Sequence, residues 1–303
     1  MYVIETNDLT KKYSGNPVVN KVNMHISEGS IYGFVGENGS GKTTIMRLLT
    51  GLAEPSGGSF TMFGVGNKDG KIHRIRKQMS AIVETTSLVP TMTAIDNMIF
   101  QELYLGIKLT KEERQELLRK VHLDNVGNKK VKNFSLGMRQ RMGIALALMN
   151  HPKLMLLDEP MNGLDPQGIA ELRDLLVELN KTEGITVLIS SHILSELEKI
   201  ATHYGFISHG HLLEELTLEE LQEKGRKSLR IVVDNIAEAE ETLKTKGIKD
   251  FKSYPNGEIV IFDFIDIGEI VALLHKKQIK ISAITSSEES VEEYYLNLIK
   301  EGK

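Results

Sequence analysis

Residues 36–43 have the types and spacing that bind phosphate. They read Gly-Glu-Asn-Gly-Ser-Gly-Lys-Thr and match the pattern G-x-x-x-x-G-K-[ST]. Gly36, Gly39 and Gly41 let the backbone turn tightly and point its N–H groups at an anion. Lys42 is expected to reach the β- and γ-phosphates, and the Thr43 hydroxyl to bind Mg²⁺. The expected nucleotide contacts are Gly36, Glu37, Asn38, Gly39, Ser40, Gly41, Lys42, Thr43 and Thr44.

The segments on either side of this loop favour phosphate binding over a plain glycine-rich turn. Residues 31–35 form an apolar run that predicts a buried strand, and residues 44–49 predict a helix. A phosphate loop needs a strand before it and a helix after it, since the helix adds the positive end of its dipole. The sequence therefore predicts a nucleoside triphosphate site.

The carboxylates that such a site needs follow another apolar run. Residues 154–157 are Leu-Met-Leu-Leu, and Asp158 and Glu159 come directly after them. An apolar run that ends in two acidic residues is a common strand end, but together with the phosphate loop it indicates catalysis. Asp158 is expected to hold the Mg²⁺ shell, and Glu159 to orient and deprotonate the attacking water.

Further segments make the sequence resemble the ABC transporter ATPases. They occur in the order typical of that family and span residues 1–215. They are Tyr13 in Lys11-Lys12-Tyr13, the signature-like stretch Asn133–Arg141 with the helix after it, Asn162-Gly163-Leu164-Asp165-Pro166, and Ser190-Ser191-His192.

This resemblance implies a shared mechanism and partners. Two ATP-binding subunits would face each other head to tail with ATP and Mg²⁺ between them. Ser135 and Gly137 of one copy would contact the γ-phosphate in the other, while Asp165 would link the two sites. His192 would steady the γ-phosphate and the water, and Tyr13 would stack on adenine. A separate integral membrane permease would be the second partner. Taken alone, Ser135 could be a simple helix N-cap.

Departures from the family pattern suggest a subgroup. Glu84 stands where the family usually has Gln in the loop that links the ATP site to the permease. A carboxylate there can still bind Mg²⁺ or its water, but it can also take up a proton. Leu136 and Met138 stand where Gly and Gln are commoner. These features and residues 286–295 resemble the bacitracin-export and lantibiotic-immunity ATPases.

Composition limits the class of protein. The chain has 303 residues, 41% hydrophobic and 26% charged, with a net charge of −4, which gives no reason to expect nucleic acid as partner. It has no cysteine, which excludes disulfides and a thiolate nucleophile. The start of the chain lacks the regions of a signal peptide, and no apolar run reaches the ~18 residues of a membrane span. We therefore expect a peripheral location at the cytoplasmic face of a bacterial membrane.

The pattern of runs predicts two domains. Residues 1–215 alternate strands and helices, as in a three-layer α/β P-loop domain, with a strongly helical stretch over 93–122 whose charged run 111–114 is expected to face solvent. Residues 216–228 are expected to form a linker with a short helix ending at Gly225. Residues 229–303 show the order βαββαβα of a small ferredoxin-like α+β domain. The expected strands of the first domain are 3–5, 31–35, 81–83, 154–157, 186–189 and 205–208.

Other functions fit the sequence less well. A GTPase needs Asn-Lys-x-Asp, whereas residues 128–131 read Asn-Lys-Lys-Val. ABC ATPases of DNA repair or translation carry a long coiled coil or tandem domains, and neither occurs here. The main expectation is an ATPase subunit that powers export of an antimicrobial peptide. A sodium or multidrug exporter is the alternative.

Overall fold

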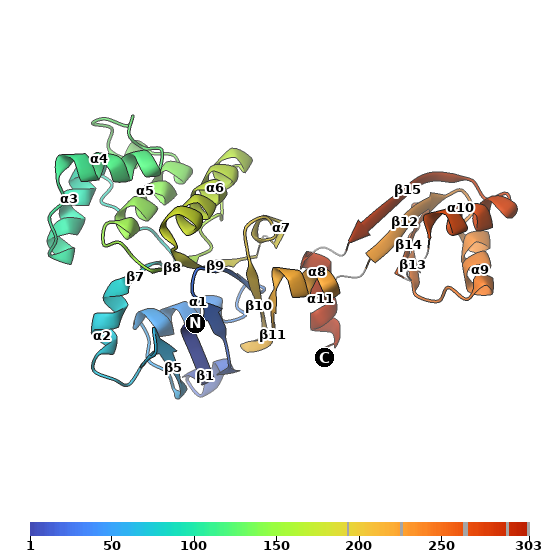
Figure 1. Ribbon diagram of the computed structural model, residues 1–303, viewed down its shortest axis with the longest axis horizontal. Coiled ribbons are helices and arrows are strands. Elements are labelled where there is room, and N and C mark those ends of the chain that lie inside the picture. Colours follow the sequence, from blue (N-terminus) through green and yellow to red (C-terminus); the bar gives the residue numbers. More distant parts are fainter. Residues whose placement is uncertain (193, 225–226, 263–265, 289–290, 302–303) are drawn as a thin grey trace. The chain divides into compact units, whose positions relative to one another are not determined.

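The computed structural model describes residues 1–192, 194–224, 227–262, 266–288 and 291–301. Contacts divide the chain into two compact units, Met1–Leu218 and Glu219–Glu301 (Figure 1). The boundary falls inside the stretch 216–228 that was expected to be a linker. That stretch contains α8 (Leu218–Lys224) and the beginning of β12 (Lys227–Val233), while Gly225 lies outside the described residues.

The larger sheet of the first unit has six strands in the order β11-β10-β4-β9-β8-β7. All neighbours are parallel except β11, which forms an antiparallel hairpin with β10. β4, β8 and β9 are apolar for most of their length because both faces of the sheet are buried. The strands are β4 (Ile31–Val35), β7 (Met79–Ile82), β8 (Leu154–Asp158), β9 (Thr186–Ser191), β10 (His203–Ser208) and β11 (His211–Thr217).

A second, antiparallel sheet was not expected from the sequence. It has the order β2-β1-β5-β6, with β3 also paired to β1. The expected strand 3–5 lies in this sheet, within the longer β1, and not among the parallel strands. Its strands are β1 (Tyr2–Tyr13), β2 (Asn16–Val22), β3 (His25–Ser27), β5 (Gly57–Met62) and β6 (Val65–Gly66).

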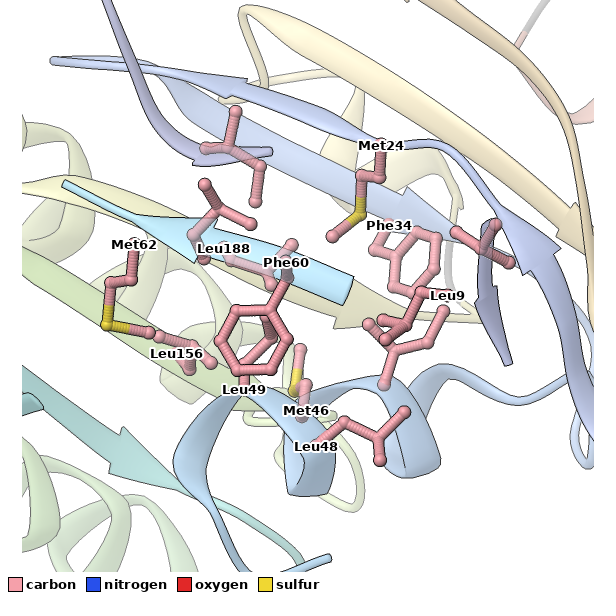
Figure 2. Packing of buried hydrophobic residues seen from close by; sticks show 14 of the residues in the cluster. Leu9, Met24, Phe34, Met46, Leu48, Leu49, Phe60, Met62, Leu156 and Leu188 are labelled. Atoms are coloured by element: carbon pink, nitrogen blue, oxygen red, sulfur yellow. The ribbon is translucent and has the colours of Figure 1, made fainter. Parts of the chain in front are cut away.

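The two sheets share one hydrophobic core with α1 (Lys42–Thr50), as Figure 2 shows. Phe60 comes from the antiparallel sheet, Met46 from α1, and Leu156 and Leu188 from the parallel sheet. All of these side chains are at most 1% exposed. This packing fixes α1, and with it the loop that precedes α1, against the carboxyl ends of the parallel strands.

The remaining helices of the first unit range from four to 18 residues. They are α2 (Ile72–Ile75), α3 (Ala94–Leu105), α4 (Lys111–Lys120), α5 (Leu136–Leu148), α6 (Pro166–Glu183) and α7 (Leu194–Leu197), with 3-10 turns η1 (Arg76–Gln78) and η2 (Val131–Asn133). The stretch 93–122, expected to be helical, is interrupted after α3. Gly106 ends that helix with a φ of 68°, and Thr110 begins α4 with a capping box.

The charged run at the start of α4 does not face solvent throughout. Arg114 donates hydrogen bonds of 2.5 and 2.8 Å to the carboxylate of Glu102 in α3. The side chain of Glu102 is only 6% exposed, and its bond to Arg114 lowers the pKa of the carboxyl. This partly buried ion pair fastens α4 to α3, which the local sequence around residues 111–114 does not reveal.

The second unit has the order expected of it. Its four-stranded sheet runs β13-β14-β12-β15, and all neighbours are antiparallel, as in a ferredoxin-like sheet. Side chains such as Ile231, Leu243 and Leu274 form its own core. Beside β12, its elements are α9 (Ile236–Lys246), β13 (Phe251–Ser253), β14 (Glu258–Ile261), α10 (Ile267–Lys276), β15 (Ile281–Glu288) and α11 (Val291–Glu301). Of the subgroup-like stretch 286–295, residues 289 and 290 lie outside the described residues.

Candidate active site

The loop of residues 36–41 joins β4 to α1 with a backbone that only glycine tolerates at several points. Gly39 and Gly41 have φ values of 82° and 111°. A Cβ on Gly36 would lie 2.5 Å from Ser40 Oγ and 2.6 Å from the carbonyl of Ile207. α1 then begins at Lys42 without a side-chain cap, so that its first N–H groups remain available to an anion.

Lys42 is held inside this loop. Its side chain is 5% exposed, and Nζ donates to the carbonyls of Gly36 at 2.6 Å and Glu37 at 3.1 Å. The same Nζ lies 3.4 Å from Glu159 Oε1. The loop thus points its cation at the acidic residue that follows β8.

Asp158 is fixed through both of its carboxylate oxygens. Oδ2 accepts a hydrogen bond of 2.8 Å from the hydroxyl of Thr43, at the start of α1. Oδ1 accepts one of 2.7 Å from the hydroxyl of Ser190, at the end of β9. Ser190 was not predicted as a site residue. The feature that could have predicted it is its position near the end of a buried strand that neighbours β8.

Glu159 lies between two basic side chains. Oε2 lies 2.7 Å from His192 Nδ1 and accepts a weaker bond of 3.3 Å from the His192 amide, whereas Oε1 faces Lys42. Oε1 is buried without a hydrogen-bond partner among the described residues. The backbone of Glu159 has a φ of 49°, which is uncommon for a non-glycine residue. The structure therefore joins Lys42, Glu159 and His192 in one cluster.

Tyr13 lies at the end of β1, in the hairpin that leads to β2. Its ring is 44% exposed, and Lys11 Nζ lies 5.0 Å from the ring centre. The same hairpin approaches the phosphate loop, because a Cβ on Gly41 would lie 2.9 Å from the carbonyl of Val18. This aromatic ring is thus presented to solvent by an element that packs against the loop.

Ser135, Gly137 and Asp165 lie together at the starts of α5 and α6. Ser135 caps α5 through Met138 N, and Asp165 caps α6 through Gly168 N. The two loops touch, since a Cβ on Gly137 would lie 3.8 Å from Leu164. Within the described residues, no hydrogen bond joins Ser135 or Asp165 to Lys42 or Glu159. The structure does not bring them to the Lys42 cluster of the same chain.

Glu84 follows β7 with a φ of 66° and pairs with Arg47 of α1. Its side chain is 56% exposed. A cavity of about 680 Å³ extends from Glu84 to Asp158 and Glu159, and Leu136 of α5 also lines it. Glu84 thus borders the same open space as the two acidic residues, although its own partner is Arg47.

Comparisons with known proteins identify the family of this chain. The family model described as ABC transporter matches residues 19–162. The bacitracin transport ATP-binding protein BcrA of Enterococcus faecalis is 40% identical over 304 residues, which covers 99% of this chain and 97% of BcrA. This chain belongs to the ABC transporter ATP-binding proteins. The resemblance seen in the motifs is confirmed, and with it the α/β P-loop fold and the role of an ATP-hydrolysing, ATP-binding subunit.

Other relatives extend the comparison. The lantibiotic transport ATP-binding protein SrtF of Streptococcus pyogenes is 44% identical over 213 residues, covering 70% of this chain and 90% of SrtF. A structure of the ATP-binding cassette MJ0796, described as dimeric and bound to ADP and Pi, is 26% identical with a TM-score of 0.63. It covers 71% of this chain and 98% of that one. Of the helices in the described ranges, none has the length and hydropathy needed to span a bilayer.

Proposed function

We propose that this ABC subunit hydrolyses Mg²⁺-bound ATP at the cluster of Lys42, Glu159 and His192. The energy drives a separate membrane permease that exports a peptide antibiotic of the bacitracin or lantibiotic type. One observation carries the catalytic part of this proposal. The carboxylate of Glu159 lies between Lys42 and His192, at the end of a strand whose last residue, Asp158, is bonded to Thr43.

Binding of ATP exchanges one partner of Lys42 for another. The Lys42–Glu159 distance of 3.4 Å marks a charge pair that the γ-phosphate would replace, since an anion there competes with the carboxylate. The backbone N–H groups of residues 36–44 would bind the β-phosphate. Tyr13, presented by the hairpin next to this loop, would stack on the adenine.

Thr43 and Asp158 supply the oxygen ligands that Mg²⁺ prefers. Their side-chain oxygens lie 2.8 Å apart, so one small cation can contact both after the Thr43 proton turns away. When bound, Mg²⁺ neutralises phosphate charge and orients the triphosphate for in-line attack. Glu84, which borders the same cavity, is proposed as a further ligand of the ion or of its water, after it leaves Arg47.

The attack on the γ-phosphate needs a base next to the water. Glu159 has one oxygen facing Lys42 and so lies beside the expected γ-phosphate position. His192 fixes the other oxygen at 2.7 Å, which orients the carboxylate and places the imidazole near the γ-phosphate that the water attacks. Glu159 would take the proton of the water while His192 steadies the phosphate.

A second copy completes the site. Ser135 and Gly137 lie at the N-terminus of the 13-residue helix α5, and within the described residues no hydrogen bond joins Ser135 to the Lys42 cluster of its own chain. In a head-to-tail dimer the positive end of α5 would meet the γ-phosphate bound by the partner. Asp165, whose loop touches the Gly137 loop, would connect the two sites. The MJ0796 structure, which is described as dimeric, supports the presence of a second copy.

The permease and the cargo are proposed from the relatives. BcrA is named for bacitracin transport and matches both units of this chain, while SrtF is named for lantibiotic transport and matches 70% of it. We assign ATP hydrolysis to residues 1–215 and an accessory role to 229–303, beyond the connecting stretch 216–228. A subunit bound to such a permease lies at the cytoplasmic face of the bacterial membrane.

Resistance measurements test this function. The subunit is expressed with a membrane permease in a susceptible bacterium, and minimal inhibitory concentrations are measured for bacitracin, a lantibiotic, sodium chloride and cationic dyes. We expect protection against one of the two peptides. The same permease expressed with the Glu159→Gln subunit should give no protection. Protection against sodium or dyes alone would contradict the peptide assignment but not the ATPase.

A further inference from the structure

We infer that Ser190 is a positioning residue that sets both Asp158 and Glu159 for hydrolysis. This inference rests on the roles proposed above for the two acidic residues. It gives a function to a hydroxyl that neither the phosphate loop nor the His192 motif requires.

A single oxygen serves both acidic residues. Ser190 Oγ donates its proton to Asp158 Oδ1 at 2.7 Å and accepts the amide proton of Glu159 at 2.9 Å. A hydroxyl has one donor and two acceptor positions, so it can make both bonds at once. Alanine at this position would leave the Asp158 oxygen and the Glu159 amide without this partner.

The bond to Asp158 fixes the direction of its other oxygen. Asp158 and Ser190 are direct partners in the register of β8 and β9. With Oδ1 held by Ser190, Oδ2 is turned toward Thr43, where the expected metal ligands meet. Asp158 is 7% and Ser190 0% exposed, so water does not readily replace the missing hydroxyl.

The bond to Glu159 acts on the backbone. Glu159 has a φ of 49°, a conformation that persists only where its surroundings hold it. The Ser190 hydroxyl bonds the amide of this residue and so supports the turn that aims its carboxylate at Lys42. β9 and the residue directly after it thus contact Glu159 at two points, Ser190 of β9 at the amide and His192 at the carboxylate.

The test compares Ser190→Ala with Ser190→Thr and with a matched control, Ser30→Ala. Ser30 is also a buried serine, but within the described part of the chain its hydroxyl bonds only the carbonyl of Ser27. Threonine keeps the hydroxyl and suits a strand. For each full-length variant, kcat and KM for ATP are measured, together with the affinity for a non-hydrolysable ATP analogue with Mg²⁺ and with EDTA. Circular dichroism melting reports whether each variant folds.

For Ser190→Ala we expect kcat to fall about tenfold, as loss of a hydrogen bond to a charged group predicts. The gain in analogue affinity on adding Mg²⁺ should fall by a similar factor, while affinity in EDTA stays the same because Lys42 and the loop are intact. Ser190→Thr should restore most of kcat, and Ser30→Ala should match the parent protein.

Two results would overturn the inference. One is a folded Ser190→Ala protein with the kcat and Mg²⁺ response of the parent. The other is an equal loss in Ser30→Ala, which would indicate a general effect of removing a buried hydroxyl. If Ser190→Thr does not fold, the comparison of the two alanine variants decides. Glu159→Gln and Asp158→Asn are measured in parallel. If both keep full activity, the proposed roles of the acidic residues fail, whereas a normal Ser190→Ala alone removes only this inference.

Discussion

Lys42 Nζ lies 3.4 Å from Glu159 Oε1, so the cation of the phosphate loop faces the carboxylate that would activate water. The two residues are far apart in the chain, and the parallel sheet brings them together at its carboxyl edge. Both side chains would contact the same γ-phosphate. Separate substitutions can therefore distinguish the residue needed for ATP binding from the residue needed for hydrolysis.

Glu159→Gln should keep ATP binding and stop hydrolysis. The amide can still contact His192, but it cannot accept the proton of the water. Removal of a negative charge beside the γ-phosphate also favours the ATP-bound state, so the head-to-tail dimer should accumulate. Gel filtration with Mg²⁺ and ATP measures this. A monomer that binds ATP fully would contradict the proposed dimer.

Lys42→Ala should weaken nucleotide binding itself. Charge-assisted contacts to phosphate are among the strong ones, so the loss is expected to be about 2–4 kcal/mol. Isothermal titration calorimetry with a non-hydrolysable ATP analogue gives the change directly. Lys120→Ala is the control, because that side chain belongs to α4 and pairs with Glu183 at the end of α6. Equal affinity in the Lys42 variant and the parent would refute the role of Lys42.

The sequence predicted the parts of the site that are local in the chain. The phosphate loop, Asp158 and Glu159 are short patterns whose chemistry depends on neighbouring residues, and the structure brings Lys42, Glu159 and His192 together. Ser190 was missed because its role depends on the register between β8 and β9. A single sequence does not contain that register.

Elements with mixed composition were missed in whole or in part. β1 was expected only over residues 3–5, because Lys11 and Lys12 lack the apolar pattern of a buried strand, and β5, which begins with glycines, was not expected. They form strands because each pairs with a neighbour and places alternate side chains in the core. The ion pair of Glu102 with Arg114 was also not predicted. It joins α3 to α4 across the break after Gly106, so the local sequence of either helix does not reveal it.

Gly36→Ala should disable the phosphate loop without unfolding the protein. A Cβ there would lie 2.5–2.6 Å from Ser40 Oγ and the Ile207 carbonyl, so the loop must shift away from β10. We expect at least a tenfold loss in affinity for the ATP analogue, which corresponds to about 1.4 kcal/mol. Gly66→Ala is the matched control, because a Cβ at that position meets open space. Similar affinities in the two variants would show that the loop tolerates the shift.

Tyr32 should make the fold sensitive to alkaline pH. Burial, and then the charge of Glu215, raises the pKa of Tyr32 well above its usual value of 10.0. Above about pH 10 the unfolded chain therefore loses a proton that the folded chain keeps, and stability falls as pH rises, by up to ~1.4 kcal/mol per pH unit. Urea unfolding at pH 8–11 measures this effect. The free energy of unfolding should fall less steeply with pH in Tyr32→Phe than in the parent protein.

At pH 8, Tyr204→Phe is the matched control for the hydrogen bond of Tyr32. Tyr32 donates a hydrogen bond of 2.7 Å to Glu215, whereas the Tyr204 hydroxyl is buried without a partner among the described residues. At pH 8, Tyr32→Phe should therefore cost about 1.5–3 kcal/mol, and Tyr204→Phe should be neutral or stabilising. The same stability for both variants at pH 8 would mean that the Glu215 bond contributes little.

Glu84→Gln should change the rate of ATP hydrolysis in the complex with the permease. Glu84 pairs with Arg47 of α1, the helix that follows the phosphate loop, and it borders the cavity shared with Asp158 and Glu159. The carboxylate must leave Arg47 before it can reach the ion, whereas an amide keeps an oxygen ligand but makes no ion pair. The Glu84→Gln complex should therefore hydrolyse ATP up to about fivefold faster, because an exposed ion pair is worth at most about 1 kcal/mol, with nucleotide affinity of the isolated subunit almost unchanged. Arg47→Gln removes the same pair from the other side and should change the rate in the same direction. Equal ATPase rates for the parent and Glu84→Gln complexes would leave Glu84 as an ordinary ligand in place of Gln.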